Sequence, residues 1–314
     1  MNTKFFFIIN GRKDKSEIKP EVEKQIKENA HHLEDWHDTY DIYVTTGEGD
    51  ATRFVRLYCD LHPNEEVCFI ACGGDGTINE VASGLVGFQK KSMSVFNMCG
   101  NSDFIRHFPN RDFKSFHDIL AGKIEQIDII KANDNYSINV AHIGFDADVT
   151  DFANGYSKMG IKDPFQKGIL RAILFSRYNK ISITIDGEKI KLRHLLLSSF
   201  ANASWYGAGM NCAPRASVID GLIDVCILKP MLMLTFAKLL PIYTRGEHFT
   251  DKRFKKKLIY RQAKHIAINA HGELFNISLD GEVVPTTKVD INILPKAISI
   301  RLPKESVPAE QQKR

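Results

Sequence analysis

The residues best suited to chemistry are a glycine turn that carries one acid. Residues 73–77 read Gly-Gly-Asp-Gly-Thr and follow the apolar run 67–72. Glycines permit positive φ and leave backbone amides uncovered, so a phosphate can approach the main chain closely. The carboxylate of Asp75 would repel that phosphate unless a divalent cation lay between them. The turn therefore indicates a site for a metal-bound nucleotide.

A strand before the turn and a helix after it must hold this turn in place. The run 67–72 has the short apolar pattern of an inner strand in a parallel sheet. Thr77 and Glu80 have the spacing of a capping box, which predicts a helix N-terminus that attracts anions at the turn. The third glycine of the dinucleotide fingerprint and the Gly-Lys-Ser/Thr of the P-loop are both missing. A strand-to-helix turn with a solvated acid is the alternative for Gly-Asp-Gly alone.

Residues 1 to about 122 alternate between strand and helix patterns. Strands are expected at 4–10, 40–45, 67–72 and 92–97, and helices at 17–32 and 51–61. This alternation is typical of a doubly wound, Rossmann-like parallel sheet, whose ligands bind at the carboxyl ends of the strands. Asn10, Thr45 and the turn at 73–77 lie at the carboxyl ends of three such strands, so we expect them to line one crevice.

From residue 125 onward the segments are short, strand-like and separated by turn signals such as Asp186-Gly187. Strands are expected at 126–131, 136–143, 180–185, 189–201, 222–228, 265–269, 275–279 and 288–293, and helices near 151–157 and 165–176. This pattern predicts a β-sandwich or a related antiparallel domain. The expected organisation is an α/β domain at 1–124, a β-sandwich domain at 125–295, and a disordered polar tail at 304–314.

Composition narrows the class of protein. The chain has 314 residues, of which 43% are hydrophobic and 25% charged, as in a globular protein with room for two domains. A net charge of +4 does not mark a nucleic-acid binder. The six cysteines include no C-x-x-C pair, so buried thiols in a reducing compartment are expected. The most apolar long segment, 231–243, is interrupted by Lys238 and Pro241 and is too short to span a membrane.

The turn and its continuation, Gly-Gly-Asp-Gly-Thr-Ile-Asn-Glu at 73–80, resemble the signature of the diacylglycerol kinase catalytic-domain family, which includes bacterial lipid kinases and sphingosine kinases. Four later segments resemble family motifs in the same order: 139–147, 206–216, Asp-Gly-Leu-Ile-Asp at 220–224, and Leu-Asp-Gly-Glu at 279–282. NAD kinases share the first five residues but lack this set. The resemblance implies an α/β nucleotide domain, a β-sandwich lipid-substrate domain, and a final strand at 296–303 that returns to the first domain.

The resemblance implies an ATP- and Mg²⁺-dependent kinase that transfers the γ-phosphoryl group to the hydroxyl of diacylglycerol or a similar lipid alcohol. Asp280 is the implied catalytic base, although Asp280-Gly281 alone would indicate a hairpin turn. Asp75 is implied to hold Mg²⁺ and to take part in catalysis. The implied nucleotide contacts are Asn10, Gly11, Arg12, Thr45, Gly73, Gly74, Asp75, Gly76, Thr77, Asn79, Glu80 and Asn101.

The family also implies a structural Mg²⁺ in the second domain. Its ligands would be the Asp220 carboxylate and the carbonyl groups of Ser217 and Leu222. An aspartate that caps its own turn is the alternative.

Two loops depart from the family pattern. Gly11 stands for a proline and Asp14 for a glycine, whereas Gly100 and Ser102 stand for a threonine and an asparagine. Arg12 and Asn101 supply polar groups in the same two loops. A catalytically impaired relative that binds nucleotide or lipid as a regulatory module is therefore an alternative, as is a kinase of a non-lipid alcohol.

The expected setting is the cytoplasm, with peripheral contact to the inner face of the membrane and no nucleic-acid partner. The basic run 253–257 follows the apolar segment 231–243 and is a candidate for docking on anionic head groups. A solvated charged face is the alternative for such a run. The sequence allows a homodimer without requiring one. No metal-ligand spacing links His142, His248 and His271, so structural or surface roles are expected for them.

Overall fold

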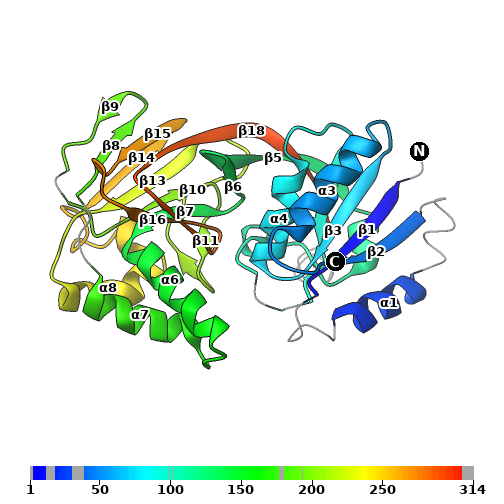
Figure 1. The fold of residues 1–314 in the computed structure, drawn as a ribbon, viewed down its shortest axis with the longest axis horizontal. Coiled ribbons are helices and arrows are strands. Elements are labelled where there is room, and N and C mark those ends of the chain that lie inside the picture. Colours follow the sequence, from blue (N-terminus) through cyan, green and yellow to red (C-terminus); the bar gives the residue numbers. More distant parts are fainter. Residues whose placement is uncertain are drawn as a thin grey trace, which may run out of the picture. The chain divides into compact units, whose positions relative to one another are not determined.

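The computed structural model describes residues 3–11, 18–29, 39–98, 100, 102–176, 180–192 and 194–305. The chain divides into two compact units, each with its own core (Figure 1). The first unit comprises residues 1–127 and 296–314, and the second comprises 128–295. The sequence placed this boundary at residue 124.

The first unit is built around a parallel sheet with the strand order β2-β1-β3-β4. Its strands are β1 (Lys4–Ile9), β2 (Thr39–Val44), β3 (Val67–Cys72) and β4 (Lys91–Val95), and the end of β18 (Lys288–Leu302) runs parallel to β4. Every residue of β3 is buried, because helices cover both faces of a parallel sheet. Ile9 is in register with Cys72 on one side and with Val44 on the other, so these three strands end at the same level.

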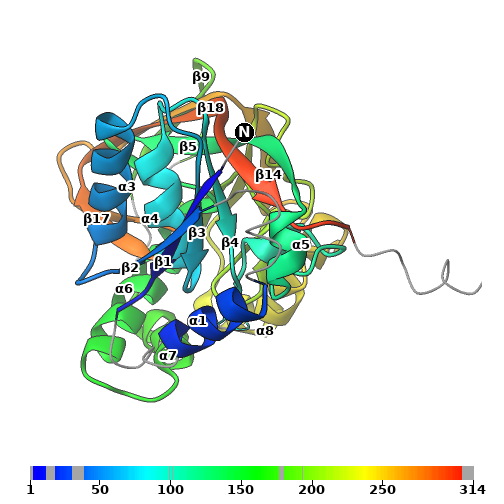
Figure 2. The same ribbon diagram turned by 90° about the vertical axis from the view of Figure 1, so that its right-hand side faces the viewer.

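Helices cover both faces of this sheet, as the alternating sequence pattern predicted. α3 (Asp50–Leu61) and α4 (Asp75–Leu85) lie on one face, whereas α1 (Ile18–Glu28) and α5 (Phe116–Leu120) lie on the other (Figure 2). Ile18, Val22 and Ile26 recur at intervals of four residues and pack against Phe5 and Phe7 of β1. The short 3-10 helix η2 (Ile105–His107) follows β4.

The second unit contains antiparallel strands in two layers. One layer is a six-stranded sheet with the order β14-β13-β10-β7-β16-β17. In the other layer the order is β18-β15-β8-β9, and β5 pairs with both β18 and β6. The strands are β5 (Lys123–Ala132), β6 (Asn135–Ser137), β7 (Val140–Gly144), β8 (Ser182–Ile185), β9 (Glu188–Lys189), β10 (Leu197–Ala201), β11 (Trp205–Tyr206), β12 (Met210–Asn211), β13 (Ile223–Leu228), β14 (Leu258–Ala263), β15 (His265–Asn269), β16 (Phe275–Leu279) and β17 (Glu282–Thr286).

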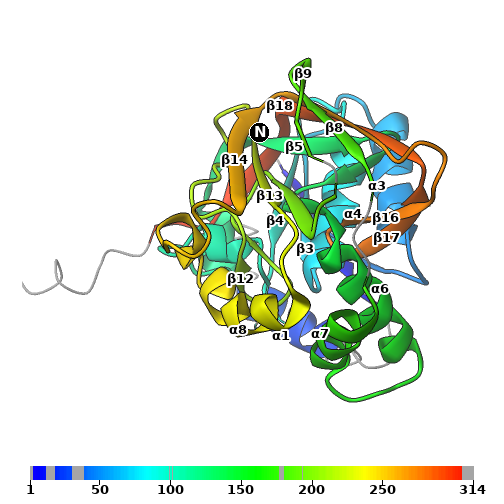
Figure 3. The same ribbon diagram turned by 90° about the vertical axis from the view of Figure 1, so that its left-hand side faces the viewer.

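The six-stranded sheet has a core on each side. Phe200 and Val225 point toward the other layer and join Ile183 and Ile266 in one cluster. Leu197 and Cys226 point the opposite way, toward a layer of helices. These helices are α6 (Phe145–Lys158), α7 (Pro164–Phe175) and α8 (Met233–Thr244), and the 3-10 helix η3 (Glu247–Phe249) follows them (Figure 3). The antiparallel sandwich-like domain predicted from the sequence is therefore present, with a helical layer added to it.

Several element boundaries differ from the sequence predictions. The strand expected at 136–143 is broken between β6 and β7, and the strands expected at 288–293 and 296–303 form one strand, β18. β14 and β17 were not predicted because they are edge strands with mostly half-buried residues and weak alternation.

The expectation of disorder from residue 304 is wrong at the start of the tail. Arg111 donates a hydrogen bond to the carbonyl oxygen of Pro303 at 2.6 Å and forms an ion pair with Glu305 at 3.1 Å. The rest of the predicted tail, 306–314, lies outside the described residues.

Candidate functional site: the phosphate-loop edge and two acidic sites

Three loops meet at the carboxyl edge of β1, β2 and β3, where the sequence predicted one crevice. The Asn10 side-chain amide donates a hydrogen bond to Thr77 Oγ1 at 3.3 Å. The backbone N–H of Gly11 donates to Thr45 Oγ1 at 3.1 Å. Hydroxyl and amide groups from three strand ends therefore line one edge of the first unit. We call residues 10–11, 45 and 73–77 the phosphate-loop edge.

Gly73 is required by close packing rather than by backbone conformation. A methyl group at this position would lie closer than van der Waals contact to Oγ1 and Cβ of Thr77. The same group at Gly74 or Gly76 would meet no atom within 4 Å. None of the three glycines uses the positive φ that glycine permits. Gly73 allows close contact with Thr77, and Gly74 and Gly76 leave open space at the start of α4.

The capping box predicted at Thr77 and Glu80 is wrong. Gly74 is the N-cap and Asp75 the first residue of α4, and Ile78 N–H donates to the Gly74 carbonyl at 3.1 Å. No side chain caps this end. Among the described residues, the backbone N–H groups of Gly76 and Thr77 have no acceptor. The helix therefore presents free donors and the positive end of its dipole.

Glu80 has a different role from that expected of a nucleotide contact. Its carboxylate accepts hydrogen bonds from the N–H groups of Gly49 and Ala51, each at 3.0 Å. The Thr52 hydroxyl donates to the Glu80 carbonyl at 2.9 Å. Glu80 thus caps the start of α3 and fixes it against α4. The neighbouring Asn79 is 5% exposed.

Asp75 is bound by the loop that follows β4. Its Oδ1 accepts hydrogen bonds from the Ser102 hydroxyl at 2.6 Å and from Phe104 N–H at 3.2 Å, and Oδ2 accepts one from Asp103 N–H at 2.9 Å. A carboxylate offers about four lone-pair positions, so about one remains on Oδ2. Ser102, which replaces the family asparagine, therefore orients the acid of the glycine turn.

Asp280 lies at a hairpin turn, as its sequence context alone suggested. Leu279 pairs with Glu282 across β16 and β17, and both Asp280 and Gly281 have positive φ. This is the geometry of a two-residue hairpin loop. The hairpin places the Asp280 side chain against the segment that joins β6 to β7.

Four groups of that segment hold the Asp280 carboxylate. Oδ2 accepts a hydrogen bond from the Ser137 hydroxyl at 2.9 Å and another from Ile138 N–H at 2.6 Å. Asn139 N–H donates to both oxygens, and Val140 N–H donates to Oδ1 at 3.0 Å. These N–H groups serve the carboxylate instead of a strand ladder, which explains the break between β6 and β7. The Asp280 carboxyl group is therefore half-buried and fixed in direction.

Asp220 lies beside a second acid that sequence reasoning missed. The Asp220 carboxylate accepts the N–H of Leu222 at 3.0 Å, as a turn aspartate does. Asp128, which is fully buried, accepts the N–H of Gly221 at 2.6 Å. Burial raises the pKa of Asp220, and the Asp128 charge raises it further. Asp128 sits within a strand pattern, so only its burial in the folded chain marks it.

The family-like segment at 139–147 carries a buried polar cluster. Tyr206 OH donates a hydrogen bond to Asp146 Oδ2 at 2.6 Å, and burial raises the pKa of Asp146 to about 7. His142 lies 3.2 Å from the Thr150 hydroxyl, and burial lowers its pKa to about 3. His142 is therefore neutral and structural, as its isolated position predicted.

The remaining sequence predictions concern two loop residues, metal ligands, membrane spans and cysteines. Arg12 and Asn101 lie outside the described residues. Within the described ranges, no three His, Cys, Asp or Glu side chains are grouped as metal ligands. The structure also contains no helix, within its described part, that is long and apolar enough to cross a bilayer. Five cysteines are buried thiols: Cys59, Cys68, Cys72, Cys212 and Cys226.

Comparison with known families gives two matches that together span most of the chain. Residues 4–132 match the family described as "Diacylglycerol kinase catalytic domain". Residues 139–302 match the family described as "YegS C-terminal NAD kinase beta sandwich-like domain". The two matches correspond to the α/β and sandwich-like parts of the fold.

Individual proteins agree with these family matches. The chain is 30% identical over 275 residues to "Diacylglycerol kinase" of Bacillus subtilis (strain 168), covering 86% of this chain and 87% of the relative. It is 29% identical over 313 residues to "Probable lipid kinase YegS-like" of Serratia proteamaculans (strain 568), covering 94% and 93%.

A solved structure shows the same fold. A crystal structure of a diacylglycerol kinase from Bacillus anthracis str. Sterne superposes with a TM-score of 0.66 at 18% identity, covering 98% of this chain and 97% of the other. The fold, the ordered motifs and the full-length relatives agree: this chain belongs to the diacylglycerol kinase family and is a lipid kinase-type enzyme.

Proposed function

We propose that this chain is an ATP- and Mg²⁺-dependent lipid kinase that phosphorylates the hydroxyl of diacylglycerol or a similar lipid alcohol. The observation that carries the proposal is the uncapped start of α4, where two free N–H groups and open glycines adjoin Asp75. Such a helix end binds phosphate through its donors and its dipole. The family indicates the type of reaction, and the residues around α4 and Asp280 are the ones we propose to carry it out.

The phosphate-loop edge would bind the nucleotide phosphates. The N–H groups of Gly76 and Thr77 would donate to phosphate oxygens. The hydroxyl of Thr45 and the amide of Asn10 are neutral polar groups that can orient a phosphate without adding charge. Gly74 and Gly76 leave the room that a close approach to the backbone requires. The role proposed for the phosphate-loop edge is therefore to position the phosphates and not to transfer protons.

Asp75 fits a role as a ligand for the nucleotide's metal ion. Its carboxylate keeps about one lone pair free, and Ser102 and two backbone N–H groups fix its direction. Carboxylate oxygen is the ligand type that Mg²⁺ prefers. The chemistry that Mg²⁺ supplies when bound is neutralisation of phosphate charge.

Asp280 would accept the proton of the acceptor hydroxyl. Three of its donors are backbone N–H groups that cannot turn away, whereas the Ser137 hydroxyl can rotate about its C–O bond. Rotation of that hydroxyl would free a lone pair on Oδ2 for the acceptor. Ser137 is then a positioning residue, and Asp280 the catalytic base.

The oxygen groups near Asp220 fit a structural divalent cation. Two carboxylates, those of Asp220 and Asp128, accept hydrogen bonds from neighbouring residues of this turn, and the Asp128 charge raises the pKa of Asp220. The carbonyl groups of Ser217 and Leu222 would add hard oxygen ligands of the kind that Mg²⁺ binds. A cation at this place would offset the repulsion between the two acids.

The direct test is phosphorylation of a panel of lipid alcohols, including diacylglycerol, by purified protein with labelled ATP and Mg²⁺. We expect a labelled lipid product with wild type. Asp280→Asn is expected to lose on the order of 10²-fold or more in kcat, as for removal of a general base. If wild type labels no lipid when nucleotide and metal are varied, the proposal is wrong. If Asp280→Asn keeps full activity, Asp280 is not the base.

A second candidate function is a regulatory module that binds lipid or nucleotide without catalysis. It is favoured by the observation that Ser102 to Phe104 already bind both oxygens of Asp75. Calorimetry separates the two functions, because a kinase must bind Mg-ATP. Lipid binding without nucleotide binding would favour the module. A kinase of a non-lipid alcohol would show Mg-ATP binding and label only the non-lipid members of a wider panel.

A further inference from the structure

Helix α7 exposes apolar side chains on its solvent face. Leu170, Leu174 and Phe175 are 61%, 68% and 64% exposed. The opposite face of the helix buries two small residues: Gly168 lies against Val149 and Ala153 of α6, and Ala172 lies in the core. α7 therefore packs on the core through one face, with Ile169 and Ile173 beside the small residues, and carries a second set of large apolar side chains on its solvent face.

Helix α8 begins with a second exposed apolar pair. Leu232, its N-cap residue, is 79% exposed and Leu234 is 75% exposed, whereas Phe236 is buried in the core beneath them. α7 contacts α8, and the two helices lie side by side along one rim of the second unit in both Figure 1 and Figure 3. We call Leu170, Leu174, Phe175, Leu232 and Leu234 the α7–α8 surface.

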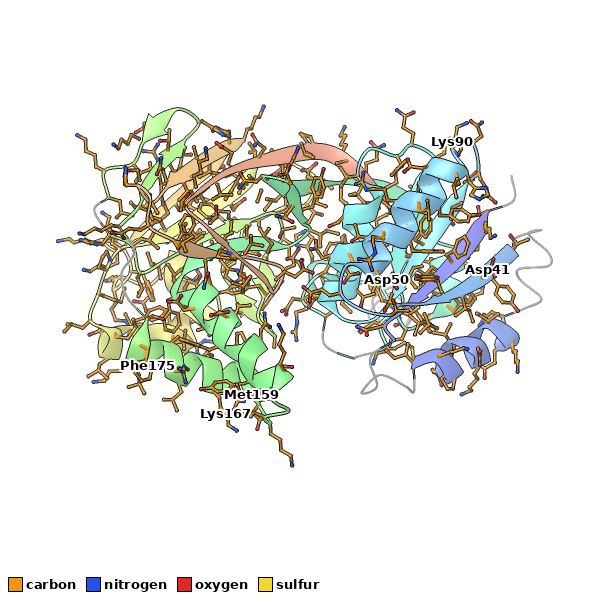
Figure 4. All side chains as sticks on the ribbon, viewed as in Figure 1. Asp41, Asp50, Lys90, Met159, Lys167 and Phe175 are labelled. Carbon is orange, nitrogen blue, oxygen red and sulfur yellow. The ribbon has the colours of Figure 1, made fainter. Side chains whose placement is uncertain are left out.

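Side chains along this rim point away from the unit. In Figure 4, Phe175 and Met159 extend outward along the same lower edge as Lys167. Met159, at the end of α6, is 75% exposed. Lys167 and Arg171 lie one turn before Leu170 and Leu174 on α7, so cations and apolar groups alternate along its exposed face.

The basic run 253–257 is fixed beside the start of α8. Lys257 Nζ donates a hydrogen bond to the Pro230 carbonyl at 3.0 Å, and Lys229 N–H donates to the Lys257 carbonyl at 2.8 Å. Lys255 and Lys256 are exposed, and no described carboxylate lies within ion-pair distance of either.

Two acids that precede this run in the chain are paired with arginines. Asp251 is paired with Arg253 at 2.6 Å, and Glu247 is paired with Arg245 at 2.7 Å. Phe254 is fully buried and cannot enter a membrane. The apolar part of any docking surface must therefore come from α7 and α8 rather than from the basic run itself.

We propose that the α7–α8 surface docks on an anionic phospholipid bilayer, with its leucines and Phe175 inserted among the head groups and Lys255 and Lys256 at the lipid phosphates. Apolar groups with flanking lysines are the combination that binds such an interface. A second copy of this chain fits less well, because a two-fold interface would place like charges opposite each other. The proposal rests on the proposed lipid-kinase function for its purpose, but its test reads binding and not phosphorylation.

Flotation with vesicles tests the proposal on the full chain without ATP. Wild type is expected to bind vesicles of phosphatidylglycerol and phosphatidylcholine more tightly than vesicles of phosphatidylcholine alone. Leu170→Ser/Leu174→Ser and Leu232→Ser/Leu234→Ser are each expected to lower the partition coefficient on the order of tenfold or more. The matched control is Leu57→Ser/Leu61→Ser on α3, where the leucines are 60% and 67% exposed. This control should bind like wild type.

The charged part of the surface is tested by Lys255→Gln/Lys256→Gln. Each lysine is expected to contribute about fivefold in binding to anionic vesicles at low salt, and the difference should shrink at high salt. Unchanged binding of both leucine variants, or equal loss in the α3 control, would overturn the proposal. Dissociation of a wild-type dimer by the leucine variants in vesicle-free sedimentation would assign this surface to a second copy instead.

The outcomes of this test and of the kinase test are distinguishable. A protein that binds anionic vesicles through this surface but phosphorylates no lipid would support docking and refute the proposed reaction. A protein that phosphorylates a detergent-solubilised lipid but shows no vesicle binding would refute docking alone.

Discussion

Substitution of Gly73 by alanine tests the packing of the glycine turn. The added methyl group would clash with the side chain of Thr77, which is buried and held by Asn10. Thr77 is β-branched and lies on a helix, so it has little rotamer freedom to move away. Overpacking of this kind costs about 1–3 kcal/mol of unfolding free energy. A displacement of this edge by about 1 Å would also reduce activity on the order of 10²-fold.

Gly76→Ala is the matched comparison, because a methyl group there meets no protein atom. Gly76 is a helical residue, so alanine should leave the folded state intact or stabilise it by about 0.5–1 kcal/mol. If the open space above Gly76 is occupied by phosphate, this variant should raise KM for ATP despite its stability. The two alanines are thus expected to differ in the sign of their effect on stability while both impair the enzyme.

Thermal denaturation and ATP-dependent kinetics would measure both effects. At about 2–4 °C per kcal/mol, Gly73→Ala should lower the melting temperature by several degrees. Gly73→Ala/Thr77→Ala removes Oγ1, the atom nearest to the added methyl group, and keeps Cβ, so the clash is partly relieved and the double-mutant cycle should give a favourable coupling of about 0.5–3 kcal/mol. Unchanged stability of Gly73→Ala, or coupling near zero, would refute the packing argument. Unchanged KM in Gly76→Ala would refute the assignment of the open space to phosphate.

Further predictions concern acids and their donors. Ser102→Ala removes one hydrogen bond to the Asp75 carboxylate and is expected to weaken Mg-ATP binding by calorimetry on the order of tenfold; equal affinity would exclude this positioning role. Ser137→Ala is expected to lower kcat, with KM for lipid nearly unchanged, because it alters only the orientation of Asp280. Burial raises the pKa of Asp146 from 3.8 to about 7, so the folded state binds the proton more tightly than the unfolded state. Stability should therefore be fullest below pH 4 for this group and fall by up to about 4 kcal/mol as pH rises through 7. Asp146→Asn should remove that pH dependence in urea titrations at pH 5 and pH 8, and an unchanged slope would contradict it.

Local patterns in the sequence were sufficient for much of the fold. The apolar run 67–72 between polar and glycine segments predicted β3 with the bounds that the structure gives. Alternating strand and helix periods predicted the parallel sheet, and Asp186-Gly187 predicted the β8–β9 hairpin. Edge strands such as β17 were missed because their side chains are half-buried and do not alternate clearly.

The candidate site was predicted in its residues but not in their contacts. Thr77 and Glu80 have capping-box spacing, yet Glu80 caps α3, since the packing of α4 on α3 offers it the N–H groups of Gly49 and Ala51. A spacing rule describes one helix at a time. It does not include hydrogen-bond partners from another helix, which come within reach only when the two helices pack together.

The sequence by itself determined the glycine turn, its acid and the order of motifs that assigns the family, because each depends on neighbouring residues. Tertiary structure decided what holds Asp280, whose partner Val140 lies 140 residues earlier in the chain. It also decided which leucines remain exposed on α7 and α8. Hydrogen-bond partners and solvent exposure depend on which distant segments contact each other in the folded chain. Local periodicity carries no information about those tertiary contacts.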